Sequence, residues 1–295
     1  LVKHTNQPTN QPRPVRRYPR RERPMLIVAL LNLCILVSPH ASTAASGVRP
    51  SASIPMLKVG QRHSDDAIFD ALGTIKGRPP NHPFVRGTLL RYPTSSMAPS
   101  SYMVNHKRFL IGHGEKAYHF ASRALLSWQL INESLEWIRI DRRGEAVTTC
   151  AKAYGVSAIN PCLYQYELID QRAARPSGRE VVYTAVGYST VKGHLLAGEE
   201  RFTVAWNQTP RKGGPVSRIF GLRKQRPAND SDSEGDGIES EKDGVWFEVY
   251  SYSRPSGVLG RLAAVAVRPL QRRFAADLAA KMPAYVAKAV KEGGD

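Results

Sequence analysis

The sequence predicts an α+β fold in which one antiparallel sheet wraps around a long C-terminal helix. Six segments between residues 136 and 252 alternate apolar and polar side chains with the two-residue period of half-buried strands. They show no helical pattern between them, which favours antiparallel pairing over a parallel sheet with crossover helices. Residues 270–286 carry an apolar stripe that would extend about 25 Å in a helix, long enough to cross such a sheet.

Residues 1–55 are expected to form a leader outside the folded domain. Their first part is rich in Gln, Asn, Pro and Arg, a composition typical of disordered arms or of translated upstream sequence. Residues 26–37 are an apolar run of twelve, too short to cross a hydrocarbon core of about 30 Å as a helix. Small residues follow around Ala44, as they do at the cleavage site of a signal peptide.

The compartment depends on where translation starts, and the sequence leaves three alternatives open. A start at Met25 would make the apolar run part of a signal or transit peptide, so the protein would enter the secretory pathway or an organelle. A start at Met56 would leave the protein in the cytoplasm. In the third alternative, the apolar run is retained as an anchor.

The folded domain is expected at residues 56–290. It begins with an irregular segment up to residue 104, because Pro-rich stretches break regular elements there. A short strand at 108–112 and a helix from Glu115 come next. The apolar positions of this helix recur at the spacing that places them on one face: Ala117, Ala121, Ala124, Leu125 and Trp128.

The six predicted strands are residues 136–141, 146–154, 162–172, 179–190, 200–206 and 245–252. Residues 207–244 carry many charged and few apolar side chains, so they are expected to form a disordered insertion. Ser231 and Ser233 each have an acidic residue three positions later, and the sequence leaves their phosphorylation open. After Pro255 the pattern is helical to the end, with Pro269 starting a second helical stretch or kinking a single one.

Composition limits the classes of partner. The net charge is +17, but much of it lies in the leader, and no alternation of basic and aromatic residues follows, which argues against nucleic acid. The three cysteines, Cys34, Cys150 and Cys162, show no zinc-ligand spacing, and no cofactor motif is present. We therefore expect neither a metal nor a cofactor. Cys150 and Cys162 are expected to be reduced core residues, and a disulfide between them is the alternative in an exported domain.

The densest polar cluster of the predicted sheet is the block GHLLAGEE, residues 193–200. His194 can titrate near neutral pH, and Glu199 and Glu200 could act as acids or bases. Adjacent strand residues point to opposite faces, so at most one of the two glutamates is expected in a pocket unless a bulge intervenes. The alternative for these residues is a structural role in a turn or a buried ion pair.

Large aromatic side chains are expected to line the core or a ligand cavity. Together with the polar block, they give the candidate ligand-binding residues Trp128, Tyr188, His194, Glu199, Glu200, Trp206 and Phe247. Gly112 and Gly114, which flank His113 before the first helix, favour a tight turn over an anion site. A lone G-x-G lacks the rest of a dinucleotide-binding fingerprint.

Four stretches resemble the uncharacterised family called domain of unknown function 1990 (DUF1990), also named UPF0548. They are FLIGHGEKAYHFASRALLSW (109–128), VGYSTVKGHLLAGEERFTV (186–204), VWFEVYSYSRP (245–255) and RPLQRRFAADLAA (268–280). The resemblance extends from about Met56 to Val286, and the chain departs from the family in its leader and its insertion. It implies a helix-grip fold, related in shape to the Bet v 1 and START ligand carriers.

The resemblance implies a non-enzymatic protein that binds a small hydrophobic or lipid ligand in a helix-grip cavity. Plant members have been linked to the plastid outer envelope, so the alternative is a cation-conducting or membrane-associated protein with a membrane surface as its partner. A second alternative is an enzyme that acts on a hydrophobic substrate through His194 and a glutamate. The sequence does not name the ligand or decide whether the protein is an enzyme.

Overall fold

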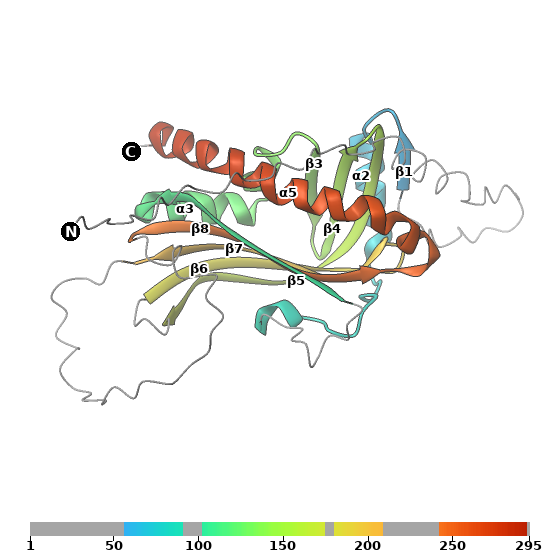
Figure 1. The fold of residues 1–295 in the computed structure, drawn as a ribbon, viewed down its shortest axis with the longest axis horizontal. Coiled ribbons are helices and arrows are strands. Elements are labelled where there is room, and N and C mark those ends of the chain that lie inside the picture. The colour runs from blue at the N-terminus through green and yellow to red at the C-terminus, as the bar shows by residue number, and fades with distance from the viewer. Residues whose placement is uncertain (1–55, 91–101, 175–179, 209–241, 294–295) are drawn as a thin grey trace, which may run out of the picture.

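The computed structural model describes residues 56–90, 102–174, 180–208 and 242–293 (Figure 1). The predicted leader lies outside the described residues. So do residues 209–241, which make up most of the predicted insertion and include both serines.

The described strands form one antiparallel sheet of eight strands in the order β2-β8-β7-β6-β5-β4-β3, with β1 paired to β5 off this path. The strands β3 to β8 pair with their neighbours in the chain, so they form the meander that the short connections predicted. Their bounds are β1 Met56–Val59, β2 Met103–His113, β3 Ile138–Arg143, β4 Ala146–Ala153, β5 Val156–Ala174, β6 Glu180–Thr190, β7 Leu196–Asn207 and β8 Gly244–Pro255.

Helices cover one face of this sheet along its length. The long helix α5 (Gly257–Glu292) crosses it from end to end, and α3 (Gly114–Leu126) and the short α4 (Gln129–Asn132) lie beside it (Figure 1). We call the face toward α5 the inner face. This combination of a large antiparallel sheet and a long C-terminal helix confirms the predicted helix-grip α+β fold.

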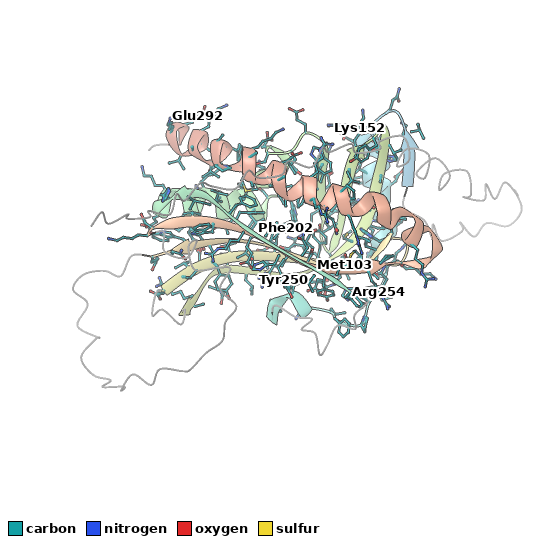
Figure 2. All side chains as sticks on the ribbon, in the orientation of Figure 1. Met103, Lys152, Phe202, Tyr250, Arg254 and Glu292 are labelled. Carbon is teal, nitrogen blue, oxygen red and sulfur yellow. The ribbon has the colours of Figure 1, made fainter. Side chains whose placement is uncertain are left out.

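The C-terminal half of α5 is held against the inner face by apolar side chains. Leu278, Met282 and Val286 recur at intervals of four residues and are buried in the main core. On the sheet side is Phe202 of β7, which is labelled in Figure 2. The centroid of its ring lies 6.2 Å from that of Phe274 of α5, and the ring stacks on Phe247 of β8. This end of the interior is therefore filled with side chains.

The other face, which we call the outer face, is covered by residues 80–90, which we call the strap. The strap contains a short 3-10 helix, η1 (Gly87–Leu90), and lies on the side of the sheet away from α5 (Figure 1). Thr88 is buried there, and Tyr250 of β8 lies on the same side of the sheet (Figure 2). Both faces of β7 and β8 are thus buried, which explains their large residues on both sides.

The sheet curls strongly at β5, so that β3 and β4 stand beside the first half of α5 (Figure 1). β5 is 19 residues long, and its pairing with β6 shifts register twice, as expected where a strand bends. Helix α2 (Asp65–Ile75) packs against the outside of this curled part, with Ile75 beside Cys150 and Ile159 in a small second core. The curl gives the inner face its concave shape.

The prediction of an irregular segment at 56–104 is wrong, because β1, α2 and η1 lie in it. The start of α2 had a readable signal: Ser64 caps the helix by accepting a hydrogen bond from the Ala67 N–H at 3.4 Å, and Asp65 and Asp66 occupy the first turn. The pairing of β1 with β5 had no recognisable sequence signal, because a strand of only four residues is ordered by its pairing partner.

The end of the chain also differs from one of its two predicted forms. Residues 257–292 form one helix that contains both Pro269 and Pro283, so Pro269 does not begin a separate helix.

The two described cysteines are free and buried, as predicted, and burial raises the pKa of the Cys150 thiol to about 11. Gly112 and His113 belong to β2, so the predicted turn is reduced to Gly114, the first residue of α3, which has a φ of +81°.

Candidate functional site

A cavity of about 210 Å³ lies between the curled part of the sheet and the first half of α5. The cavity begins where the packed aromatic core ends, since Tyr188 and Phe274 pack in that core and also line the cavity. Strands from β3 to β8 supply its walls, and α5 closes it with Leu270, Gln271 and Phe274. The part of the inner face that the sheet curl lifts away from the helix is therefore the part that stays open.

Most of the exposed surface of the cavity wall is apolar, but polar side chains from several elements also line it. Its apolar part includes Trp137, Ile138, Ile140, Ala151, Leu195, Leu196, Leu270 and Phe274. Its polar part includes Thr149, Asn160, Tyr188, Thr190, His194, Glu200, Ser251, Ser253 and Gln271. An apolar pocket with a few polar groups is the usual composition of a site for a small molecule.

Glu200 and Tyr188 form the most tightly bonded polar pair in this wall. They are cross-strand partners on β7 and β6, and the Tyr188 hydroxyl donates to Glu200 Oε2 at 2.5 Å. Burial raises the pKa of Glu200 to about 7, and the hydrogen bond from Tyr188 opposes this rise. The carboxyl group is therefore expected to titrate near neutral pH.

His194 lies in the loop between β6 and β7 and also lines the cavity. Its Nδ1 accepts a hydrogen bond from the Leu196 N–H at 2.9 Å, and burial lowers its pKa to about 4. The imidazole is therefore neutral at pH 7. Because Nδ1 is the acceptor, the ring proton is on Nε2, which forms no hydrogen bond with the described residues.

We expect the His194 ring to stay neutral, with its proton on Nε2, down to pH 5.5. Burial disfavours the cation, and protonated Nδ1 would face the Leu196 N–H directly. NMR of the full chain with ¹⁵N-labelled histidine measures both the tautomer and the titration of each ring. A His194 resonance with a midpoint near 6.5, identified by its loss in His194→Gln, would contradict this assignment.

Glu199 borders the cavity, but its carboxylate points to the outer face. Oε2 accepts hydrogen bonds from the Arg86 N–H at 2.7 Å and from the Ser189 hydroxyl at 2.9 Å. Oε1 accepts from the Thr88 N–H at 2.9 Å and from the Thr88 hydroxyl. Glu199 thus anchors the strap, which is the structural alternative that the sequence left open, and only Glu200 of the two glutamates presents its carboxyl group to the cavity.

The other candidate aromatic residues lie outside the cavity wall. Trp128 and Phe247 are in the packed core, where Trp128 lies 6.1 Å from Tyr188 and 6.0 Å from Phe202 between ring centroids. Trp206 is farther along β7, where it stacks on Tyr118 and donates from Nε1 to Asp243 at 2.7 Å. Their side chains support the core, so ligand contact by them stays an untested prediction that the cavity geometry does not favour.

The sequence did not single out most of the wall residues as site residues. Ile138 and Ile140 of β3, together with Thr149 and Ala151 of β4, alternate with outward residues, so the two-residue period marked the row that lines the cavity. Nothing in the local sequence showed that this row faces an open volume, because that depends on the curl of β5.

The described residues contain no group of three or more His, Cys, Asp or Glu side chains placed to hold a metal ion. Among the helices that the structure describes, none is long and apolar enough to cross a membrane.

Comparison with models of known protein families shows to which family the chain belongs. The model of the family "Domain of unknown function (DUF1990)" matches residues 91–215 and 237–281, which is more than half of the chain. The chain belongs to the DUF1990 family. The match is interrupted within the predicted insertion, and it includes the GHLLAGEE block and the first half of α5, where the DUF1990 domain has its cavity.

Two curated proteins are similar to this DUF1990 chain. A UPF0548 protein of Arabidopsis thaliana is 25% identical over 186 residues, which cover 61% of this chain and 72% of the relative. A UPF0548 protein of Dictyostelium discoideum is 24% identical over 184 residues, which cover 60% of this chain and 70% of the relative. Both names agree with the family that the four sequence stretches indicated.

Solved structures show only a distant likeness. Ara h 8.0201 has a TM-score of 0.31 and 11% identity, covering 63% of this chain and 99% of that one. An uncharacterised protein from Rhizobium leguminosarum has a TM-score of 0.27 and 10% identity, covering 63% of this chain and 98% of that one. At this level of similarity, neither structure carries an inference about a ligand or an activity.

Proposed function

We propose that this DUF1990 protein binds a compact hydrophobic ligand, or the end of a lipid chain, in the cavity between the curled sheet and α5. The observation that carries the proposal is the mostly apolar cavity of about 210 Å³ in an otherwise packed interior. Small-molecule sites usually enclose roughly 300–1,000 Å³. The ligand is therefore small, or only part of it enters.

Binding rather than catalysis is the function that the polar groups of the wall support. His194 and Glu200 are the groups that could transfer protons, but neither is hydrogen-bonded to a serine, threonine or cysteine among the described residues. Both line the cavity, so they are suited to orient a ligand. A polar group of the ligand would meet them while its apolar part contacts β3, β4 and α5.

Filling the cavity tests this proposal. Thr149 lines the cavity from the middle of β4, so Thr149→Phe would place a ring in the open volume, whereas Thr149→Val keeps nearly the same shape. For hexan-1-ol titrated into the full chain by calorimetry, we expect Thr149→Val to bind like the unchanged protein and Thr149→Phe to bind at least about tenfold more weakly.

Thermal unfolding of both variants controls for a loss of fold. If Thr149→Phe is folded and binds hexan-1-ol as well as Thr149→Val does, the ligand is not in this cavity. If the unchanged protein binds none of the three ligands hexan-1-ol, hexylamine and hexanoate at millimolar concentration, the proposed function is refuted.

A further inference from the structure

We infer that the ligand of this cavity is a cation, a compact apolar amine whose ammonium group is bound by the Glu200 carboxylate. The inference rests on the proposed function and names the chemical class of the ligand. It follows from the charges in the cavity wall, the unused hydrogen-bonding capacity of Glu200 and the aromatic rings around it.

The wall contains a carboxyl group and no basic partner for it. None of its residues is lysine or arginine, and its one histidine, His194, is neutral at pH 7. Glu199 directs its carboxylate to the strap on the outer face. The charge that can develop in the cavity is therefore the negative charge of Glu200. A buried carboxylate without a counterion is costly, and a bound cation would supply that counterion.

One oxygen of Glu200 is free to accept a hydrogen bond from a ligand. Oε2 accepts from the Tyr188 hydroxyl, while Oε1 forms no hydrogen bond or ion pair with the described residues. Although it lacks a partner, Oε1 is not fully buried, so it reaches open volume. An ammonium group at this oxygen would form a charge-assisted hydrogen bond. Tyr188 would hold the carboxylate in place from the other side.

Among the described residues, the elements around Glu200 place no lysine or arginine in the cavity wall. On β5 the nearby group is Cys162, whose thiol stays protonated because burial raises its pKa. On α5 the wall residues Leu270, Gln271 and Phe274 are uncharged. On β7 itself, Arg201 faces the opposite side and binds the Thr88 carbonyl and Glu248.

Of the charged residues on α5 nearest to the wall, Arg268 and Arg272 are exposed, and Arg273 and Asp277 bind each other. Arg273 pairs with Asp277 at 3.2 Å, and Asp277 also accepts a hydrogen bond from Trp137 Nε1. Neither Arg273 nor Asp277 is part of the cavity wall. The Arg273 guanidinium also lies 4.8 Å from the centre of the Trp137 ring, so it is not available to Glu200.

The aromatic rings of the wall favour the same ligand charge. Trp137, Tyr188 and Phe274 line the cavity, and aromatic faces attract ammonium groups. A fatty acid or other anion would instead meet the negative charge of Glu200. It would have to bind when Glu200 is protonated, without a lysine or arginine in the wall to receive its carboxylate.

Binding of an amine should therefore strengthen as Glu200 ionises. Burial raises the pKa of Glu200 to about 7, so the carboxylate fraction grows from pH 6 to pH 8. An alkylamine, like a lysine side chain, keeps its proton over this range. Its affinity rises with pH, whereas the affinity of an alcohol of the same length stays level.

The experiment compares three ligands of one shape, hexylamine, hexan-1-ol and hexanoate, by calorimetry on the full chain at pH 6 and pH 8. At pH 8 we expect hexylamine to bind at least about tenfold more tightly than hexan-1-ol, and hexanoate to bind more weakly than either. Glu200→Gln keeps the size and the hydrogen bond to Tyr188. It should remove the preference for the amine over hexan-1-ol, together with the pH dependence of amine binding.

The outcomes separate this inference from the proposed function. Equal binding of the amine and the alcohol at pH 8, with both lost in Thr149→Phe, would overturn the inference and leave the cavity as a binding site for neutral ligands. Tighter binding of hexanoate would also overturn it. Binding of none of the three ligands would refute the proposed function itself. An amine preference that survives in a folded Glu200→Gln variant would place the cation away from Glu200.

Discussion

Gly198→Ala is expected to lower the free energy of unfolding by about 3 kcal/mol or more. Gly198 is paired with Ser253 of the neighbouring strand, and a methyl group added to it would lie 2.0 Å from the Tyr252 carbonyl oxygen and 2.7 Å from the Ser253 Cα. Both atoms belong to the backbone of β8, so they cannot move away without disrupting the pairing of β7 with β8. Urea denaturation of the full chain measures the change.

Gly73→Ala is the matched control because it adds the same methyl group elsewhere. Gly73 lies within α2, and a Cβ there would meet nothing within 4 Å apart from its chain neighbours and the helix's own backbone. Alanine is favoured over glycine inside helices, so this variant should gain up to about 1 kcal/mol. Two substitutions of one kind thus have opposite predicted signs. A loss of less than about 1 kcal/mol in Gly198→Ala would contradict the close approach of β7 and β8.

Arg201→Met is expected to destabilise the protein by roughly 3 kcal/mol and to loosen the strap. The Arg201 guanidinium donates to the Thr88 carbonyl at 2.7 Å and to Glu248 Oε1 at 2.5 Å, and both charged side chains are less than one-tenth exposed. Methionine fills much of the same volume but removes the guanidinium from Glu248, whose Oε2 also lies 3.3 Å from His106 Nε2. Removing one member of a buried pair is far more costly than removing both.

An exposed ion pair provides the control for this second variant. Arg172 and Glu180 form a contact of 3.1 Å, but their side chains are 64% and 51% exposed, so Arg172→Met should change stability by less than about 0.5 kcal/mol. Amide hydrogen exchange adds a local readout, because the N–H groups of Arg86 and Thr88 bond to Glu199 beside Arg201. If Arg201→Met and Arg172→Met lose equal stability, the outer-face ion pair does not hold the strap.

The candidate site was only partly readable from the sequence. The GHLLAGEE block marked a real polar region, and the two-residue period correctly placed Glu199 and Glu200 on opposite faces. The sequence could not say which glutamate faces the helix. That is settled by the strap, since its Arg86 and Thr88 N–H groups take the Glu199 carboxylate and lie more than 100 residues away along the chain.

The aromatic candidates show a second limit. Trp128, Phe247 and Tyr188 are all large, apolar and on the inner side of the fold, so the sequence treats them alike. In the structure only Tyr188 borders the open volume, because it lies where the packed core meets the curled part of the sheet. Whether an aromatic side chain fills the interior or lines a cavity depends on which elements approach it from across the chain.

The amino-acid pattern was enough to predict the α+β class, the helix that follows β2, the antiparallel order of the strands and the long terminal helix. These properties follow from the local periodicity of apolar residues and from turn residues, both of which can be recognised within a short stretch of sequence. The position of the sheet curl, the residues that cover the outer face and the location of the open cavity became visible in the three-dimensional structure. These features depend on contacts between segments far apart in the chain, such as the contact of the strap with β7. Such contacts produce no periodic pattern of apolar and polar residues in either segment, so they cannot be recognised from the local sequence.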